Sequence, residues 1–166
     1  YCAMNSVSKA VMTFVSQNYG AKKYDRIIKI IKYSTIISVI VGLSLGTIGT
    51  LISKPLLGLI ADSSEIVDYA FRRVLIVCLP YFLCGVMEVL SFSMRALGKS
   101  FMSMIISLLG SCVLRIIWVN VMFSFFPSYD LIFVSYPATW IITGVILFAF
   151  LSKMLKELKV EASLQQ

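Results

Sequence analysis

The sequence predicts an all-α, polytopic integral membrane helix bundle with about five transmembrane helices, and three observations support this fold class. Of the 166 residues, 59% are hydrophobic and only 14% are charged, whereas soluble proteins average roughly 45–50% apolar and about 25% charged residues. Four apolar segments are each long enough to cross a bilayer, which takes about 20 residues. The charged residues fall mainly between these segments. This composition excludes an ordinary soluble domain and a disordered chain.

The first expected helix covers residues 2–17 and is the weakest candidate for a span. Its apolar side chains, such as Met4, Val11 and Val15, recur at helical spacing and form one stripe. The remaining side chains are mostly polar, and within a membrane such a face turns toward protein or a water-filled cavity. A soluble amphipathic helix is the alternative interpretation.

The next two expected helices, 33–53 and 70–94, carry glycine and proline at informative positions. Gly42 and Gly46 form a GxxxG motif, which permits close helix approach and which we assign to ordinary packing rather than to a dimer face. Pro55 follows the apolar run and is expected to mark the end of the span. Pro80 lies inside the later helix and should kink it, because proline has no backbone N–H.

The last two expected helices cover residues 101–126 and 131–155. The first of them holds a single charge, Arg115, and residues 131–152 hold none. The segment that follows is rich in lysine, and residues 160–166 are expected to form a short cytoplasmic tail. Together, residues 1–159 are expected to form most of one six-helix lobe.

The charges between the apolar segments indicate how the chain crosses the membrane. The net charges of the connecting segments 22–32, 54–73, 94–100, 127–130 and 153–159 are +4, 0, +2, −1 and +2. Because cytoplasmic loops of membrane proteins carry excess Lys and Arg, we expect the first, third and fifth of these segments, and the C-terminus, in the cytoplasm. The overall net charge of +7 is thereby explained without nucleic acid as a partner. We expect a bacterial plasma membrane, the cell inner membrane, as the location.

Several kinds of chemistry are excluded by the residues present. The chain contains no histidine, which removes Ser-His-Asp and Cys-His catalysis and His-ligated metal sites from it. The four cysteines form no CxxC pair and are expected to be buried apolar residues. We therefore expect no enzyme, no metal site and no cofactor. Because the first residue is Tyr1 and not Met, we expect a C-terminal part of a longer protein.

Charged side chains inside spans are costly and mark candidate functional sites. Glu88 and Lys9 are expected at a similar depth, roughly 10–12 Å from the same membrane surface at 1.5 Å per residue. We hypothesise that they form a pair that faces an internal cavity. As a coupling site, the pair would bind a proton or a cation at Glu88 in one state and the Lys9 amine in the other. A static ion pair that fixes the helix register is the alternative.

Further residues are candidates for lining such a cavity. They are polar, aromatic or charged side chains inside the expected spans: Asn5, Ser8, Thr13, Gln17, Tyr81 and Arg115. Hydrogen bonding between helices is the alternative role for the polar ones. Arg115 lies too deep to reach Glu88, and we expect a freed backbone carbonyl or a carboxylate outside this chain as its partner. Tyr136 and Trp140 are expected in the interfacial aromatic belt.

Two sequence motifs, in order and with matching spacing, resemble one known family. The segment FVSQNYGAKKYDR at 14–26 resembles the GQNLGA-type stretch that ends the second helix of each lobe in multidrug and toxic compound extrusion (MATE) transporters. The segment SFSMRALGKS at 91–100 resembles the RGLGKS-type signature at the inner end of the fourth helix, with Ala96 in place of the usual glycine. The segments PLLGLIADSSEIVDYA and SYPATWIITG are also similar to the family.

The resemblance implies a twelve-helix protein of two six-helix lobes around a central cavity, with this chain as its last five helices. It also implies export of cationic or amphipathic organic compounds in exchange for H⁺ or Na⁺ by alternating access. The expected partners are therefore the lipid bilayer, such a substrate and the N-terminal lobe. Glu88 matches no coupling carboxylate of the family, so its role is inferred from its position alone.

Two other functions stay open at this point. One is a lipid-linked oligosaccharide flippase of the same superfamily, and the other is a membrane scaffold without transport activity. Because half a transporter lacks the opposite wall of the cavity, we expect no transport by these 166 residues alone.

Overall fold

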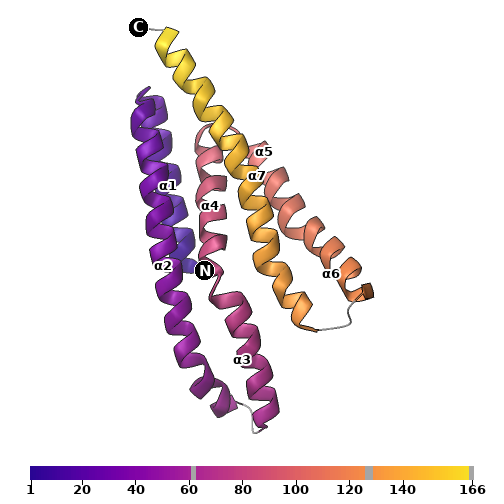
Figure 1. Ribbon diagram of the computed structural model, residues 1–166. Helices are drawn as coiled ribbons and strands as arrows, with labels where there is room; N and C mark the ends of the chain where they lie inside the picture. Colours follow the sequence, from indigo (N-terminus) through magenta and orange to yellow (C-terminus); the bar gives the residue numbers. More distant parts are fainter. Residues whose placement is uncertain (61–62, 126–128, 165–166) are drawn as a thin grey trace.

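In the computed structural model, residues 1–60, 63–125 and 129–164 are described, and all the regular elements among them are helices (Figure 1). In chain order they are α1 (Cys2–Gly20), α2 (Tyr24–Ile60), α3 (Ser64–Cys78), α4 (Tyr81–Ala96), α5 (Ser100–Leu108), the π-helical turn η1 (Leu109–Val113), α6 (Leu114–Phe125) and α7 (Tyr129–Leu164). The expected connection at 127–130 and the ends of the expected segments 101–126 and 160–166 fall partly outside the described residues.

Four helical stretches of the described chain are long and apolar enough to cross a membrane. They are α2, α3 with α4, α5 with η1 and most of α6 (Ser100–Met122), and residues Asp130–Val160 of α7. Helix α1 is not among them, which agrees with its mixed polar and apolar faces. The predicted class, an all-α membrane helix bundle, is therefore confirmed.

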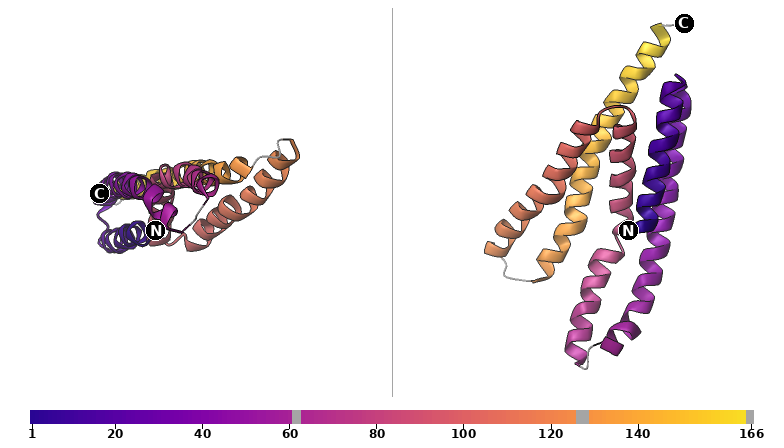
Figure 2. Two further views of the ribbon diagram at one scale, coloured as in Figure 1. Left: turned by 90° about the horizontal axis from the view of Figure 1, so that it is seen from below. Right: turned by 180° about the vertical axis from the view of Figure 1, so that it is seen from behind.

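Helix α4 lies at the centre of the bundle. It packs against α1, α2, α5 and α7, whereas α6 contacts mainly α7 and diverges from the other helices (Figures 1 and 2). The core residues Val15, Ile27, Met94 and Leu147, one from each of α1, α2, α4 and α7, are all fully buried. Every residue of α4 is buried or half-buried, whereas each of the helices around it has exposed residues, as expected for a central helix.

The prediction that Pro80 kinks a continuous helix understated its effect. Helix α3 ends at Cys78 and α4 begins at Tyr81, so one span is built from two helices. Proline cannot donate a backbone hydrogen bond, and its ring collides with the preceding turn. The backbone N–H of Leu83 donates to the Pro80 carbonyl at 2.9 Å, which starts the new helix.

The glycines of α2 pack against this break. A Cβ atom on Gly42 would lie 2.7 Å from the Cα atom of Phe82, and one on Gly46 would collide with the carbonyl oxygen of Cys78. Both glycines are buried. The GxxxG motif thus serves close helix packing within this chain, as predicted.

Two expected helix ends are absent. Helix α2 continues through Pro55 to Ile60, so the proline does not end it. Nearby, the hydroxyl groups of Thr50 and Ser53 donate to the carbonyls of Gly46 and Thr50 at 2.8 and 2.7 Å. Helix α7 runs to Leu164, so the segment expected as a frayed tail is helical as far as it is described.

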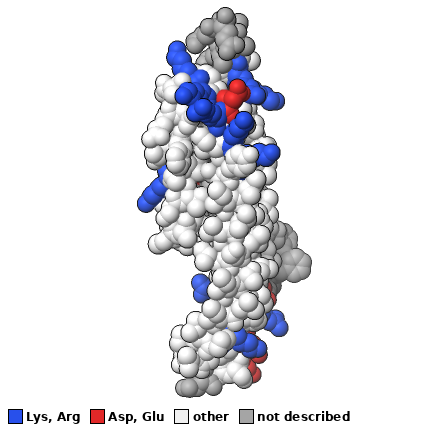
Figure 3. Space-filling view, turned by 90° about the vertical axis from the view of Figure 1, so that its left-hand side faces the viewer, with Lys and Arg blue, Asp and Glu red and all other residues white. Residues whose placement is uncertain are grey.

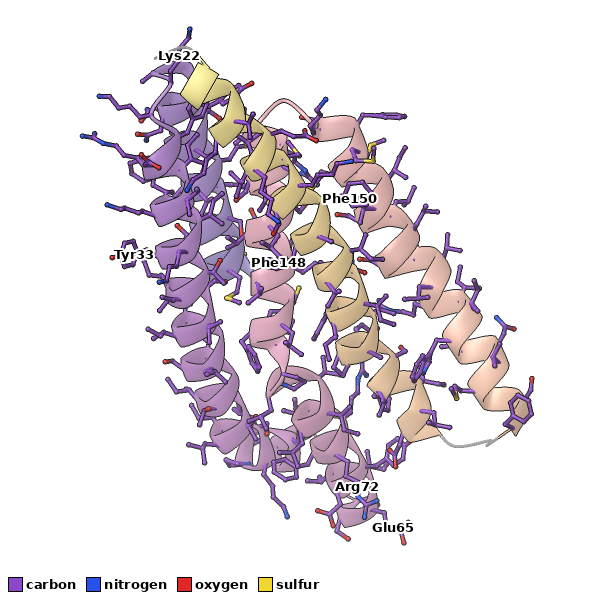
Figure 4. All side chains as sticks on the ribbon, turned by 45° about the horizontal axis from the view of Figure 1, so that its top comes forward. Lys22, Tyr33, Glu65, Arg72, Phe148 and Phe150 are labelled. Carbon is purple, nitrogen blue, oxygen red and sulfur yellow. The ribbon has the colours of Figure 1, made fainter. Side chains whose placement is uncertain are left out.

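Charged side chains gather near the two ends of the elongated molecule, and its middle is almost free of them (Figure 3). Lys22 lies at one end, and Glu65 and Arg72 lie at the other (Figure 4). This separation is what a bilayer requires, because charge is costly in its hydrocarbon core.

Candidate functional site

Glu88 lies on the central helix α4, half-buried, and faces α1. Its carboxyl group faces the hydroxyl groups of Tyr1 and Ser8 on that side. Its Oε2 atom is buried and has no hydrogen-bond partner. Next to it, the side-chain amide of Asn5 donates to the Tyr1 hydroxyl at 3.0 Å, and the Asn5 Oδ1 atom is buried without a partner. We call Tyr1, Asn5, Ser8 and Glu88 the Glu88 cluster.

The Glu88 cluster presents mainly oxygen atoms. A carboxylate with one unpartnered oxygen can accept a proton, and oxygen ligands are those that hard cations prefer. In the part of the chain that the structure describes, no group of three or more His, Cys, Asp or Glu residues could hold a metal ion.

The hypothesised pair between Lys9 and Glu88 does not form. The ion pair recorded among the described residues joins Lys54 to Asp68 at 3.2 Å, at the opposite end of the molecule. Lys9 is exposed on α1, whereas its neighbour Ser8 is fully buried beside α4. Successive residues of a helix point about 100° apart, so the side that places Ser8 against Glu88 turns Lys9 away.

The other cavity candidates on α1 divide between its two faces. Asn5 and Ser8 lie on the inner side with the Glu88 cluster, while Thr13 and Gln17 are exposed together with Lys9. The Thr13 hydroxyl donates to the Lys9 carbonyl of its own helix at 3.2 Å. A role for Lys9, Thr13 and Gln17 in lining a cavity stays a prediction.

Arg115 lies near the start of α6, half-buried, and contacts α7. One of its terminal nitrogens donates to the Thr139 hydroxyl at 3.3 Å, and its guanidinium lies 4.0 Å from the centre of the Tyr136 ring. Its Nε atom is buried without a hydrogen-bond partner. Among the described residues, the partners of Arg115 are thus a hydroxyl and an aromatic face instead of the freed carbonyl that we expected. A carboxylate outside this chain as a further partner stays a prediction.

Aromatic side chains connect Arg115 to the central helix. Tyr136 packs edge-on against Trp140 with ring centres 6.0 Å apart, and Trp140 packs in the same way against Tyr81 of α4 at 5.4 Å. Trp140 is 6% exposed. Trp140 is thus buried and Tyr136 half-buried against neighbouring helices, and their place in an interfacial belt stays a prediction.

The polar partner of Arg115 was detectable in the sequence. Ser135, Thr139 and Thr143 are spaced four residues apart, lie on one side of α7 and are all fully buried. A polar stripe on an otherwise apolar helix indicates a face turned toward other helices. The spacing alone did not indicate which helix would meet it.

The π-helical turn η1 immediately precedes Arg115. It begins near Gly110, and a Cβ atom on that glycine would collide with the side chain of Thr143. Such turns occur frequently at functional sites. Here the turn lets the chain approach α7 closely and sets the direction in which Arg115 points.

Comparisons with known proteins agree with this architecture. The family model MatE matches residues 1–122. The protein described as "Probable multidrug resistance protein YoeA", from Bacillus subtilis (strain 168), is 25% identical over 174 residues, and the alignment covers 99% of this chain and 36% of that protein. This chain thus spans about a third of the length of the curated relative that it matches.

Two solved structures share the fold. The crystal structure of the Vibrio cholerae MATE transporter VcmN in the bent form superposes with a TM-score of 0.80 at 18% identity and covers 95% of this chain and 36% of that one. A crystal structure of MATE in complex with MaL6 gives a TM-score of 0.80 at 13% identity and covers 92% of this chain and 35% of that one. The chain therefore belongs to the MatE family of membrane transport proteins, the family that its motifs resemble.

Proposed function

We propose that this chain is part of a secondary-active multidrug exporter that exchanges an organic substrate for H⁺ or Na⁺ by alternating access. Membership of the MatE family supports the transport class. The observation that carries the coupling role is Glu88, an ionisable side chain within a candidate span whose Oε2 atom has no partner. Ionisable residues inside membranes commonly belong to ion or substrate pathways.

In this proposal the Glu88 cluster is the site that takes up and releases the coupling ion. Tyr1 immediately precedes α1, Ser8 lies on α1 and Glu88 lies on α4. Any movement of α1 relative to α4 therefore changes the number of oxygen atoms around the ion. Such a change would give the ion different affinities in the two states, which is what coupling requires.

We further propose that the chain supplies helices of a C-terminal lobe and works with a complementary N-terminal lobe. The share of the relatives that it spans supports this assignment. The exposed polar face of α1, with Lys9, Thr13 and Gln17, would then face the substrate cavity. The lysine-rich end, and with it the C-terminus, would lie in the cytoplasm of a bacterial cell.

The test is efflux of a fluorescent organic cation from cells that produce this chain together with its complementary N-terminal lobe. An imposed H⁺ or Na⁺ gradient should drive efflux by the unchanged protein, and Glu88→Gln should abolish the response to that gradient because the amide cannot bind and release a proton. The matched control is Glu65→Gln, since Glu65 is exposed at the start of α3. Membrane levels of each variant are measured by immunoblotting.

Gradient-driven efflux that is unchanged in a well-expressed Glu88→Gln variant would disprove the coupling role. Absence of dye efflux in all variants, together with a cell-wall defect on deletion of the gene, would instead support the oligosaccharide flippase. Efflux that depends on Glu88 but not on Glu65 would support the proposal.

A further inference from the structure

A groove lies between α2 and α7 and is closed at its base by α4. Its volume is about 570 Å³. Its walls include Ile31 of α2, Leu90 of α4, and Phe148 and Leu155 of α7. Figure 4 shows Phe148 on the side of α7 that faces α2.

A second groove, of about 260 Å³, lies between α4 and α7 and continues the first one. The two grooves share the lining residues Val86, Leu90 and Phe148. The two grooves together follow α7 from Leu155 to Trp140, which is roughly 22 Å at 1.5 Å per residue. One leaflet of a bilayer contributes about 15 Å of hydrocarbon. The combined groove is therefore long enough for one lipid acyl chain.

The mouth of the groove is polar and positively charged. Lys32 lines it together with the hydroxyl-bearing side chains of Thr35 and Ser152. Lys29 lies one turn before Lys32 on α2, and Lys153 follows Ser152 on α7; both are exposed. Figure 3 shows Lys and Arg gathered at this end of the molecule. The groove thus combines apolar walls with a cationic entrance.

We propose that this groove binds one anionic phospholipid, with an acyl chain along α7 and the phosphate at Lys32. Lysines at the membrane surface attract anionic headgroups, and a lysine can extend its side chain to the headgroup level while its stem stays against apolar side chains. A zwitterionic lipid would fill the apolar part equally well but would gain less from Lys32. A cationic substrate is disfavoured at this entrance because Lys32 repels it.

The test is native mass spectrometry of the protein in detergent micelles, titrated with dioleoyl-phosphatidylglycerol or dioleoyl-phosphatidylcholine. The unchanged protein should bind the anionic phosphatidylglycerol (the glycerol lipid) more tightly than the zwitterionic phosphatidylcholine (the choline lipid). Lys32→Gln should weaken its binding about five-fold, which corresponds to the loss of one lysine near a membrane surface, and should leave the choline lipid almost unaffected. The matched control is Lys99→Gln, because Lys99 is exposed at the turn between α4 and α5 and does not line the groove.

Two further variants separate the two halves of the proposal. Lys32→Arg keeps the charge and should restore binding of the glycerol lipid. Ser152→Phe places a large side chain in the groove and should weaken binding of both lipids. Equal affinity for the two lipids, or an equal loss in Lys32→Gln and Lys99→Gln, would overturn the headgroup site. Undiminished binding to Ser152→Phe with a native circular dichroism spectrum would overturn the acyl site. These measurements do not involve transport, so their outcome is independent of the proposed function.

Discussion

Replacing Gly42 by alanine should force α2 and α4 apart at the centre of the bundle. The new Cβ atom would lie 2.7 Å from the Cα atom of Phe82 and 2.9 Å from the Cε atom of Met4. Ordinary carbon–carbon contacts are about 3.5–4.0 Å, so the two helices must separate by roughly 1 Å. The methionine can rotate away, but the Cα atom of Phe82 belongs to the backbone and cannot.

Overpacking of this kind typically costs about 1–3 kcal/mol, and the gain from replacing a helical glycine by alanine offsets about 0.5–1 kcal/mol of it. We therefore expect Gly42→Ala to lower the free energy of unfolding by about 0.5–2 kcal/mol. The assay is reversible unfolding in mixed detergent micelles, followed by far-UV circular dichroism.

The matched control is Gly49→Ala on the same helix, because a Cβ atom there would meet nothing within 4 Å. This control should raise the free energy of unfolding by about 0.5–1 kcal/mol, because alanine is favoured over glycine inside a helix. If Gly42→Ala proves as stable as Gly49→Ala, the close approach of α2 and α4 is not rigid and the packing argument fails.

Two further predictions concern side-chain interactions. Thr139→Val should lower the free energy of unfolding by about 1–2 kcal/mol, because Arg115 loses its 3.3 Å hydrogen bond and a half-buried charge left without its partner is costly. The control is Thr47→Val, at an exposed position of α2. An equal effect of both changes in the same unfolding assay would refute the prediction. Asp68→Asn should change the free energy of unfolding by less than about 1 kcal/mol, because the ion pair with Lys54 is exposed and such pairs contribute little. A loss above about 2 kcal/mol in the same assay would contradict this prediction.

The sequence predicted the helical class and the spans well because long apolar runs and clustered charges depend on composition alone. It also predicted the packing role of Gly42 and Gly46, since small residues at that spacing have few other uses. The ends of the helices were harder to predict from the sequence. Pro55 is tolerated inside α2 while Pro80 separates α3 from α4, and the difference lies in the surrounding contacts rather than in the proline itself.

The candidate site was predicted only in part, because depth in the membrane can be counted along the chain but direction around a helix cannot. Lys9 and Glu88 were matched by depth, yet Ser8 and not Lys9 faces α4. Arg115 was recognised as an unusual charge, but its partner Thr139 is 24 positions away. Such a partner depends on which helices become neighbours, and no local pattern in the sequence specifies that.

The π-helical turn η1 has a consequence for how this span tolerates insertions and deletions. A turn of this kind is equivalent to one extra residue in an α-helix, and one residue corresponds to a rotation of about 100°. Ser103 bonds to Ser91 of α4 before the turn, and Arg115 reaches Thr139 of α7 after it. Loss of a single residue between 109 and 113 would keep both halves helical but swing Arg115 toward lipid. The turn therefore sets the rotation about the helix axis between two halves of the span that face different neighbours.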